Sequence, residues 1–146
     1  MIWFAVRLSV WLCALPLLLR MRPLPVLLQR LTPPTDGHPR CSPLEWEQAV
    51  RIVVRMCQLR LWRWPMFPRA CLLQALALYY GLTRLGCPVV IHFGVHKAGQ
   101  ELRGHSWVTV QGKPVAESTP LGAFHTIYAF PPASYCTPLD REVVVR

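Results

Sequence analysis

The fold is decided by residues 68–95, PRACLLQALALYYGLTRLGCPVVIHFGV, where a helical pattern gives way to a strand pattern. Residues 69–85 are dense in Leu and Ala, which favour helices, and Gly86 is a typical helix end. After Cys87 and Pro88, residues 89–95 are rich in β-branched side chains that alternate with other types. That pattern predicts a strand directly after the helix.

The chain on both sides of this stretch extends the same order. Downstream, residues 104–118 read GHSWVTVQGKPVAES, with alternation over 105–111, a turn at Gln111-Gly112 and a short strand over 113–116. Upstream, Ser42 precedes Pro43 and Glu45, which is a helix-start signal for a helix over residues 43–62. The sequence therefore predicts an α+β domain, with N-terminal helices followed by a small antiparallel sheet.

Composition limits the function classes. A chain of 146 residues has room for one domain, and 53% hydrophobic against 16% charged residues argues against a disordered chain. The net charge is +9, but the Lys and Arg residues are not clustered with aromatic residues in a known recognition motif. No nucleic-acid partner is therefore expected. A basic surface suits an acidic peptide or anionic lipid. Six cysteines without a CxxC pair argue against a structural metal site, and no cofactor is expected.

Three segments follow from the distribution of proline and charge. Residues 1–32 form an N-terminal segment with one or two amphipathic helices, 33–42 are a Pro-rich linker and 43–146 are the main domain. The apolar run lacks preceding cations and a small-residue cleavage site, so it does not resemble a signal peptide. Its uncharged part, residues 8–19, is too short to span a bilayer. A cytoplasmic protein with reduced thiols is expected, and the first 32 residues pack on the domain or lie on a membrane or partner surface.

Cys71 is the cysteine that points to chemistry. It falls in the first turn of the predicted helix over residues 69–85, where unpaired backbone N–H groups and a partial positive charge favour a thiolate. A thiolate is the nucleophilic form of cysteine, and the same N–H groups can stabilise an oxyanion. A buried structural cysteine is the competing interpretation.

His105 and Glu117 are candidate partners of this cysteine. His105 opens the predicted strand, which would present its imidazole rigidly at a sheet edge. Glu117 follows the tight hairpin, so the returning chain can bring its carboxylate near the start of that strand. A cysteine nucleophile needs such a base, and the base needs a group that orients its second nitrogen. A solvated loop carboxylate is the competing interpretation for Glu117.

Other candidates have more than one interpretation. Trp64 and Phe67 either line a substrate cleft ahead of Cys71 or fill the core, and Trp107 is a wall of the site or a core residue. His92 and His96 lie on one side of a strand, but no fourth ligand with metal-site spacing is recognisable, so no metal is expected.

Taken together, residues 68–95 and 104–118 resemble the leader peptidases of lasso-peptide biosynthesis, which are transglutaminase-like, papain-like cysteine proteases. The resemblance covers residues 62–130 and rests on a cysteine at a helix start and on a histidine followed by a small residue, Trp and Val. It implies a papain-like or transglutaminase-like core with the nucleophile at a helix N-terminus.

The resemblance also implies an activity. A triad of Cys71, His105 and Glu117 would cleave the leader from a ribosomally made precursor peptide through a thioester, although the family usually has Asp as the acid. It implies a small leader-recognition protein and a macrolactam-forming cyclase as partners, with this chain as the protease half. Two alternatives stay open: a non-catalytic precursor-binding module of the same fold, and a membrane-surface protein that uses the N-terminal apolar segment.

Overall fold

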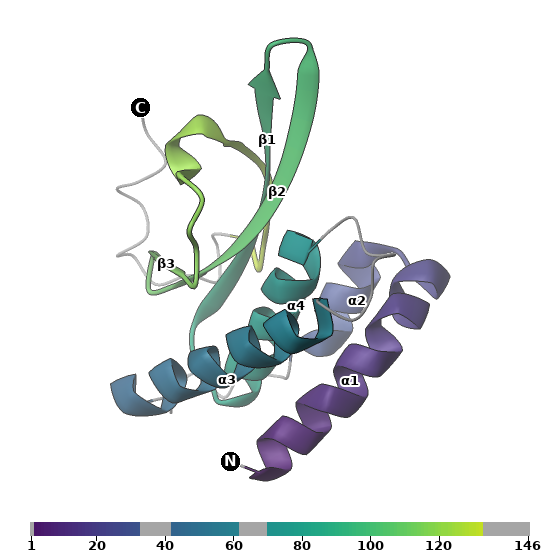
Figure 1. Cartoon of the computed structure of the whole chain (residues 1–146), viewed down its shortest axis with the longest axis vertical. Helices are drawn as coiled ribbons and strands as arrows, with labels where there is room; N and C mark the ends of the chain where they lie inside the picture. The colour runs from purple at the N-terminus through teal and green to yellow at the C-terminus, as the bar shows by residue number, and fades with distance from the viewer. Residues whose placement is uncertain (1, 33–41, 62–69, 133–146) are drawn as a thin grey trace.

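The α-helices all precede the strands in the described part of the chain (Figure 1), which confirms the predicted α+β class. The computed structural model describes residues 2–32, 42–61 and 70–132. Within these ranges the elements are α1 (Ile2–Met21), α2 (Leu24–Leu31), α3 (Pro43–Leu61), α4 (Ala70–Arg84), β1 (Val89–Ala98), β2 (Glu101–Val110), β3 (Lys113–Val115), the short 3-10 helix η1 (Leu121–Ala123) and β4 (His125–Phe130).

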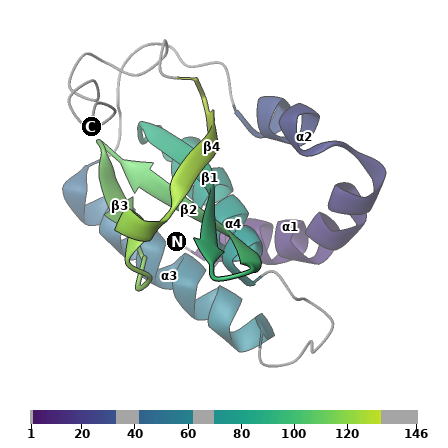
Figure 2. The same ribbon diagram turned by 90° about the horizontal axis from the view of Figure 1, so that it is seen from above.

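Helix α4 is the centre of the core. Every residue from 75 to 82 is buried, as is typical of a helix that is covered on all sides. It contacts α1 and α3 on one side and β1 and β2 on the other, and Figure 2 shows the strands lying across it. Two aromatic residues tie it to the N-terminal helices: Tyr80 stacks on Trp11 with 4.5 Å between ring centroids, and the Tyr79 hydroxyl lies 2.7 Å from Thr32 Oγ1.

Helix α3 starts where the sequence predicts. The Glu45 carboxylate accepts hydrogen bonds from the Ser42 backbone N–H at 3.1 Å and from its hydroxyl at 2.9 Å, and the Glu45 N–H donates to Ser42 Oγ at 3.3 Å. This reciprocal pairing satisfies donors that the first turn leaves unpaired. The inner face of α3 carries apolar side chains into the core, which are Trp46, Ala49, Val50, Val53 and Cys57.

The sheet has the strand order β3-β2-β1-β4, and all neighbours are antiparallel. Gln111 and Gly112 make the predicted turn between β2 and β3, both with positive φ, as tight hairpins require. One expectation differs from the structure, because His105 is the fifth residue of β2 rather than its first. Strand β2 lies between β1 and β3, but β3 pairs only with residues 108–110, so His105 has a paired strand on the β1 side alone.

The N-terminal segment is part of the same core as α4. Leu8, Leu12 and Leu15 of α1, with three leucines of α2, belong to the cluster that also contains the α4 side chains. Helix α1 differs from the expected amphipathic helix, because apolar side chains also cover its exposed face. No helix among the described residues is long and apolar enough to cross a bilayer. The predicted linker lies almost wholly outside the described residues.

The cysteines differ in whether they are free thiols or disulfide-bonded. Cys57 and Cys71 are free thiols, with Cys57 buried and Cys71 partly buried. Cys87 is disulfide-bonded, so the expectation of reduced thiols throughout the chain does not hold at this position.

Candidate active site

His105 and Glu117 form a hydrogen-bonded pair with little exposure to solvent. His105 Nε2 lies 2.8 Å from Glu117 Oε2, and the two side chains are only 14% and 12% exposed. The other carboxylate oxygen, Oε1, accepts a hydrogen bond of 2.8 Å from the Thr119 backbone N–H. The carboxylate is therefore fixed at both oxygens, and it fixes the imidazole ring in turn.

The environment of Glu117 favours its ionised form. Burial alone raises the pKa of Glu117, but the hydrogen bonds from the Thr119 backbone and from His105 outweigh that effect, so the net pKa is lowered. An ionised carboxylate only accepts hydrogen bonds, so neutral His105 must carry its proton on Nε2. Its Nδ1 then has a free lone pair, which can accept a proton from another group.

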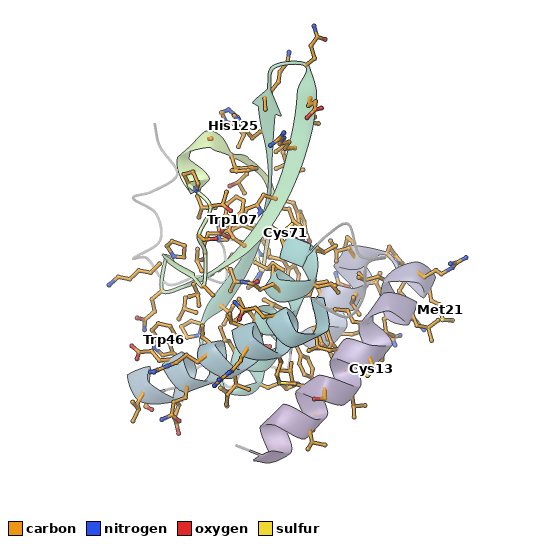
Figure 3. All side chains as sticks on the ribbon, in the orientation of Figure 1. Cys13, Met21, Trp46, Cys71, Trp107 and His125 are labelled. Atoms are coloured by element: carbon orange, nitrogen blue, oxygen red, sulfur yellow. The ribbon has the colours of Figure 1, made fainter. Side chains whose placement is uncertain are left out.

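Cys71 lines the same cleft as this pair. The cleft has a volume of about 190 Å³, and its lining includes Cys71, His105 and Glu117. Cys71 is the second residue of α4, so it lies in the first turn of the helix. Figure 3 shows Cys71 at the end of α4 that lies next to β2, with Trp107 nearby. The structure thus brings the three residues predicted from the sequence to one cavity, from α4, from β2 and from the segment after β3.

Gln74 of α4 connects the helix to the segment after β3 that carries Glu117. Its Nε2 donates a hydrogen bond of 3.0 Å to the carbonyl oxygen of Ala116. Ala116 directly precedes Glu117 and has a φ of 54°, in the left-handed region that residues other than glycine enter only at a cost. The Gln74 side chain therefore holds the backbone at Ala116, the residue directly before Glu117.

Aromatic rings support His105 on the sheet. Trp107 is two residues further along β2, on the same side, and its ring stacks on His105 at 6.0 Å and on His92 at 5.4 Å between centroids. The ring of Phe124, just after η1, lies beside the His105 ring, with 5.2 Å between the two ring centroids. His92 also pairs with Thr109 Oγ1 at 2.9 Å. The His105 ring is thus held by neighbouring rings as well as by its hydrogen bond to Glu117.

Gly94 leaves the room that Trp107 occupies. It is the cross-strand neighbour of His105, and a Cβ atom at this position would lie 2.8 Å from two atoms of the Trp107 ring. Such a separation is much shorter than carbon atoms tolerate. Glycine on β1 is therefore a condition for the position of the indole beside His105.

The structure describes only some of the other candidate residues. Trp64 and Phe67, the candidate substrate residues, lie outside the described residues, whereas Trp107 lines the cleft. His92 is engaged by Thr109 and Trp107, and in the described part of the chain no three His, Cys, Asp or Glu side chains gather to hold a metal ion.

Thr119 and Phe124 contact the pair but were not predicted from the sequence. Thr119 had no specific local signal, because the side chains that typically accept a hydrogen bond from the backbone two residues later are Asp, Asn, Ser and Thr, whereas position 117 is Glu. Phe124 had none, since its position depends on how η1 folds back over the sheet.

Residues 9–129 match the family described as the transglutaminase-like superfamily. This match covers 121 of the 146 residues and includes Cys71, His105 and Glu117. No curated protein matches the chain. No solved structure matches it either.

Proposed function

Because the chain belongs to the transglutaminase-like superfamily, we propose that it is a cysteine peptidase in which Cys71 is the nucleophile, His105 the base and Glu117 the orienting acid. The observation that carries this proposal is the shared cleft of the three side chains, in which Glu117 occupies Nε2 of His105 and leaves Nδ1 free. A Cys–His pair with a third, orienting group is the arrangement that nucleophilic cysteine catalysis requires.

The first half of the reaction forms a thioester. His105 Nδ1 takes the proton of the Cys71 thiol, and the thiolate attacks the carbonyl carbon of the scissile peptide bond. Backbone N–H groups in the first turn of α4 stabilise the negative oxygen that develops. His105 then gives its proton to the departing amine, the C–N bond breaks, and the acyl group remains on sulfur.

The second half releases the acyl group. His105 removes a proton from a water molecule, which attacks the thioester carbonyl and forms the new carboxylic acid. The S–C bond breaks and the sulfur regains its proton from His105. Throughout this cycle Glu117 keeps the Nε2 proton in place and stabilises the imidazolium while it exists.

For the substrate, we propose the leader segment of a ribosomally made lasso-peptide precursor. The motif around Cys71 and the run from His105 to Val108 support this assignment, because they resemble the leader peptidases of that pathway. The net charge of +9 suits an acidic peptide substrate. On this proposal the chain acts with a small leader-recognition protein, and the freed core peptide passes to a macrolactam-forming cyclase.

The test is cleavage of a precursor peptide followed by mass spectrometry, with a leader-binding protein present. We expect the wild-type chain to release the leader, and Cys71→Ala to abolish release while it still folds. Cys13→Ala is the matched control, since Cys13 is another cysteine but lies on α1 and does not line the cleft. Cleavage by Cys71→Ala at the wild-type rate would rule out the mechanism.

The same experiment separates the proposal from a non-catalytic binding module. A binding module would retain the precursor without cutting it, and Cys71→Ala would behave like the wild type. A live nucleophile should also be labelled by iodoacetamide near neutral pH at Cys71 and much less at the buried Cys57, because only an accessible thiolate reacts.

A further inference from the structure

A continuous apolar stripe covers the outer face of α1. Val6, Val10, Leu17 and Met21 are between 51% and 71% exposed, and Cys13 and Ala14 on the same face are exposed as well. These positions recur every three or four residues, so at about 100° per residue they fall on one side of the helix. Figure 3 shows Cys13 and Met21 on the side of α1 that faces away from α3.

The stripe is not needed to attach α1 to the protein. The opposite face already does so, since Leu8, Leu12 and Leu15 are buried in the core and Trp11 stacks on Tyr80. Four of the nine large hydrophobic side chains that the described residues expose lie in this one helix. A contiguous exposed apolar patch of this kind marks an interaction surface.

Cations border the stripe. Arg7 and Arg20 are exposed, and with about 100° per residue they fall on its two opposite borders. Arg22 and Arg30 follow in the turn after α1 and in α2, and both are exposed. The first 32 residues contain these four arginines and no Asp or Glu. The surface therefore combines an apolar centre with a rim of one charge sign.

We propose that this face of α1 docks on an anionic lipid surface. The aliphatic stripe would enter the boundary between headgroups and acyl chains, and the arginines would contact the phosphate groups beside it. A helix of 20 residues that lies flat gives a contact about 30 Å long, which differs from a membrane span. A second copy of the chain fits poorly, because it would place arginine rims against each other.

The proposed orientation leaves the cleft accessible. Helix α1 lies beside α4 on the side away from the sheet, whereas Cys71 lies at the end of α4 next to β2 (Figures 1 and 3). The stripe faces away from α4, so a membrane against it would not cover the cleft between α4 and β2. Membrane docking is therefore compatible with peptide cleavage, but does not depend on it.

Vesicle co-sedimentation of the full chain tests this proposal without any activity measurement. The probes are vesicles of phosphatidylcholine alone and vesicles that also contain phosphatidylglycerol. We expect binding to the anionic vesicles, little binding to the neutral ones and weaker binding at high salt. Equal binding to both vesicle types, or binding to neither, would overturn the proposal.

Matched variants locate the contact. The double variant Val10→Asp with Leu17→Asp should weaken binding at least tenfold, since each substitution would place a charged carboxylate where an apolar side chain would enter the lipid. Arg7→Gln with Arg20→Gln should weaken binding roughly thirtyfold at low salt, at about fivefold per cation. The control is Leu102→Asp with Ile127→Asp, which are 71% and 67% exposed but lie on β2 and β4. A control that loses binding as much as the stripe variants would contradict the assigned face.

Sedimentation velocity tests whether a second copy of the chain, instead of lipid, covers the stripe. If the wild-type chain dimerises and Leu17→Asp makes it monomeric, the stripe is an interface between copies and the lipid proposal is wrong. A wild-type chain that remains monomeric at the concentrations of the vesicle assay agrees with docking on lipid.

Discussion

At the residue scale, the coupling of Glu117 to His105 decides which imidazole nitrogen can act as a base. The hydrogen bonds to both oxygens lower the pKa of Glu117, so the carboxylate is ionised at neutral pH. A lowered pKa means that the pairing stabilises the fold above the ordinary pKa of 4.5 and that this contribution is lost as the pH falls through the lowered value. The pair is thus intact over the neutral pH range.

Replacing Glu117 tests its role. We expect Glu117→Ala to reduce turnover of the precursor by roughly two to four orders of magnitude, because His105 loses the group that fixes its tautomer and supports its charged form. Glu117→Asp keeps a carboxylate, so it should retain more activity than the alanine variant. Steady-state kinetics of both variants, with thermal unfolding to confirm that each is folded, provide the measurement. Unchanged turnover in Glu117→Ala would remove Glu117 from the mechanism.

At the scale of secondary-structure elements, the position of His105 depends on how β1 and β2 pack against each other. Gly94 of β1 lies opposite His105 of β2, and the Trp107 ring occupies the space in which a side chain at position 94 would lie. The ring is held between His92 and His105, so it cannot move aside without disturbing His105. A small change on one strand is therefore expected to reach the active site on the next.

Gly94→Ala measures this dependence. The added methyl group would lie 2.8 Å from the indole and 3.1 Å from the His125 carbonyl oxygen, so we expect a loss of about 1–3 kcal/mol in stability together with reduced turnover. Gly104→Ala is the matched control, since it adds the same methyl group on β2 where no atom lies within 4 Å. Urea unfolding and precursor cleavage are compared for the two variants. Equal effects of both substitutions would show that the contact with Trp107 is not the cause.

The elements also show what a single sequence can and cannot predict. Helix α3 and the β2–β3 turn were predictable because Ser42, Glu45 and Gly112 act within a few residues of the structure they specify. Strand β4 was missed, because its outer residues are exposed and it is specified by pairing with β1, about 30 residues earlier. The site follows the same division: Cys71 and His105 were recognisable in their local context, whereas the support from Gly94 and Phe124 depends on contacts between elements.

At the scale of the whole molecule, the buried thiol of Cys57 links stability to alkaline pH. Its burial in the core raises the pKa of Cys57 from 9.0 to about 11. Since the folded state favours the neutral thiol, this contribution to stability is complete below pH 9 and is lost as the pH rises from 9 through 11. The N-terminal helices, α3 and α4 share this core, so the effect should appear in global unfolding.

Comparison with Cys57→Ala isolates this contribution. Between pH 8.5 and 10.5 the wild-type chain should lose about 1–2 kcal/mol more stability than the variant, since the variant has no thiol to ionise. The variant will be less stable than the wild type at both pH values because of the cavity it creates, so only the pH-dependent difference is informative. Urea titrations at the two pH values give the result, and an equal loss in both proteins would contradict the assignment to Cys57.

The burial of α4 has a consequence for how a peptidase of this design would be controlled in a cell. The proposed nucleophile belongs to the helix that the rest of the chain encloses, so a molecule that has not finished folding, or that has begun to unravel, has no assembled catalytic centre. Peptidase activity would be confined to fully folded molecules. Damaged or nascent copies would then be substrates for other proteases without being able to digest their neighbours.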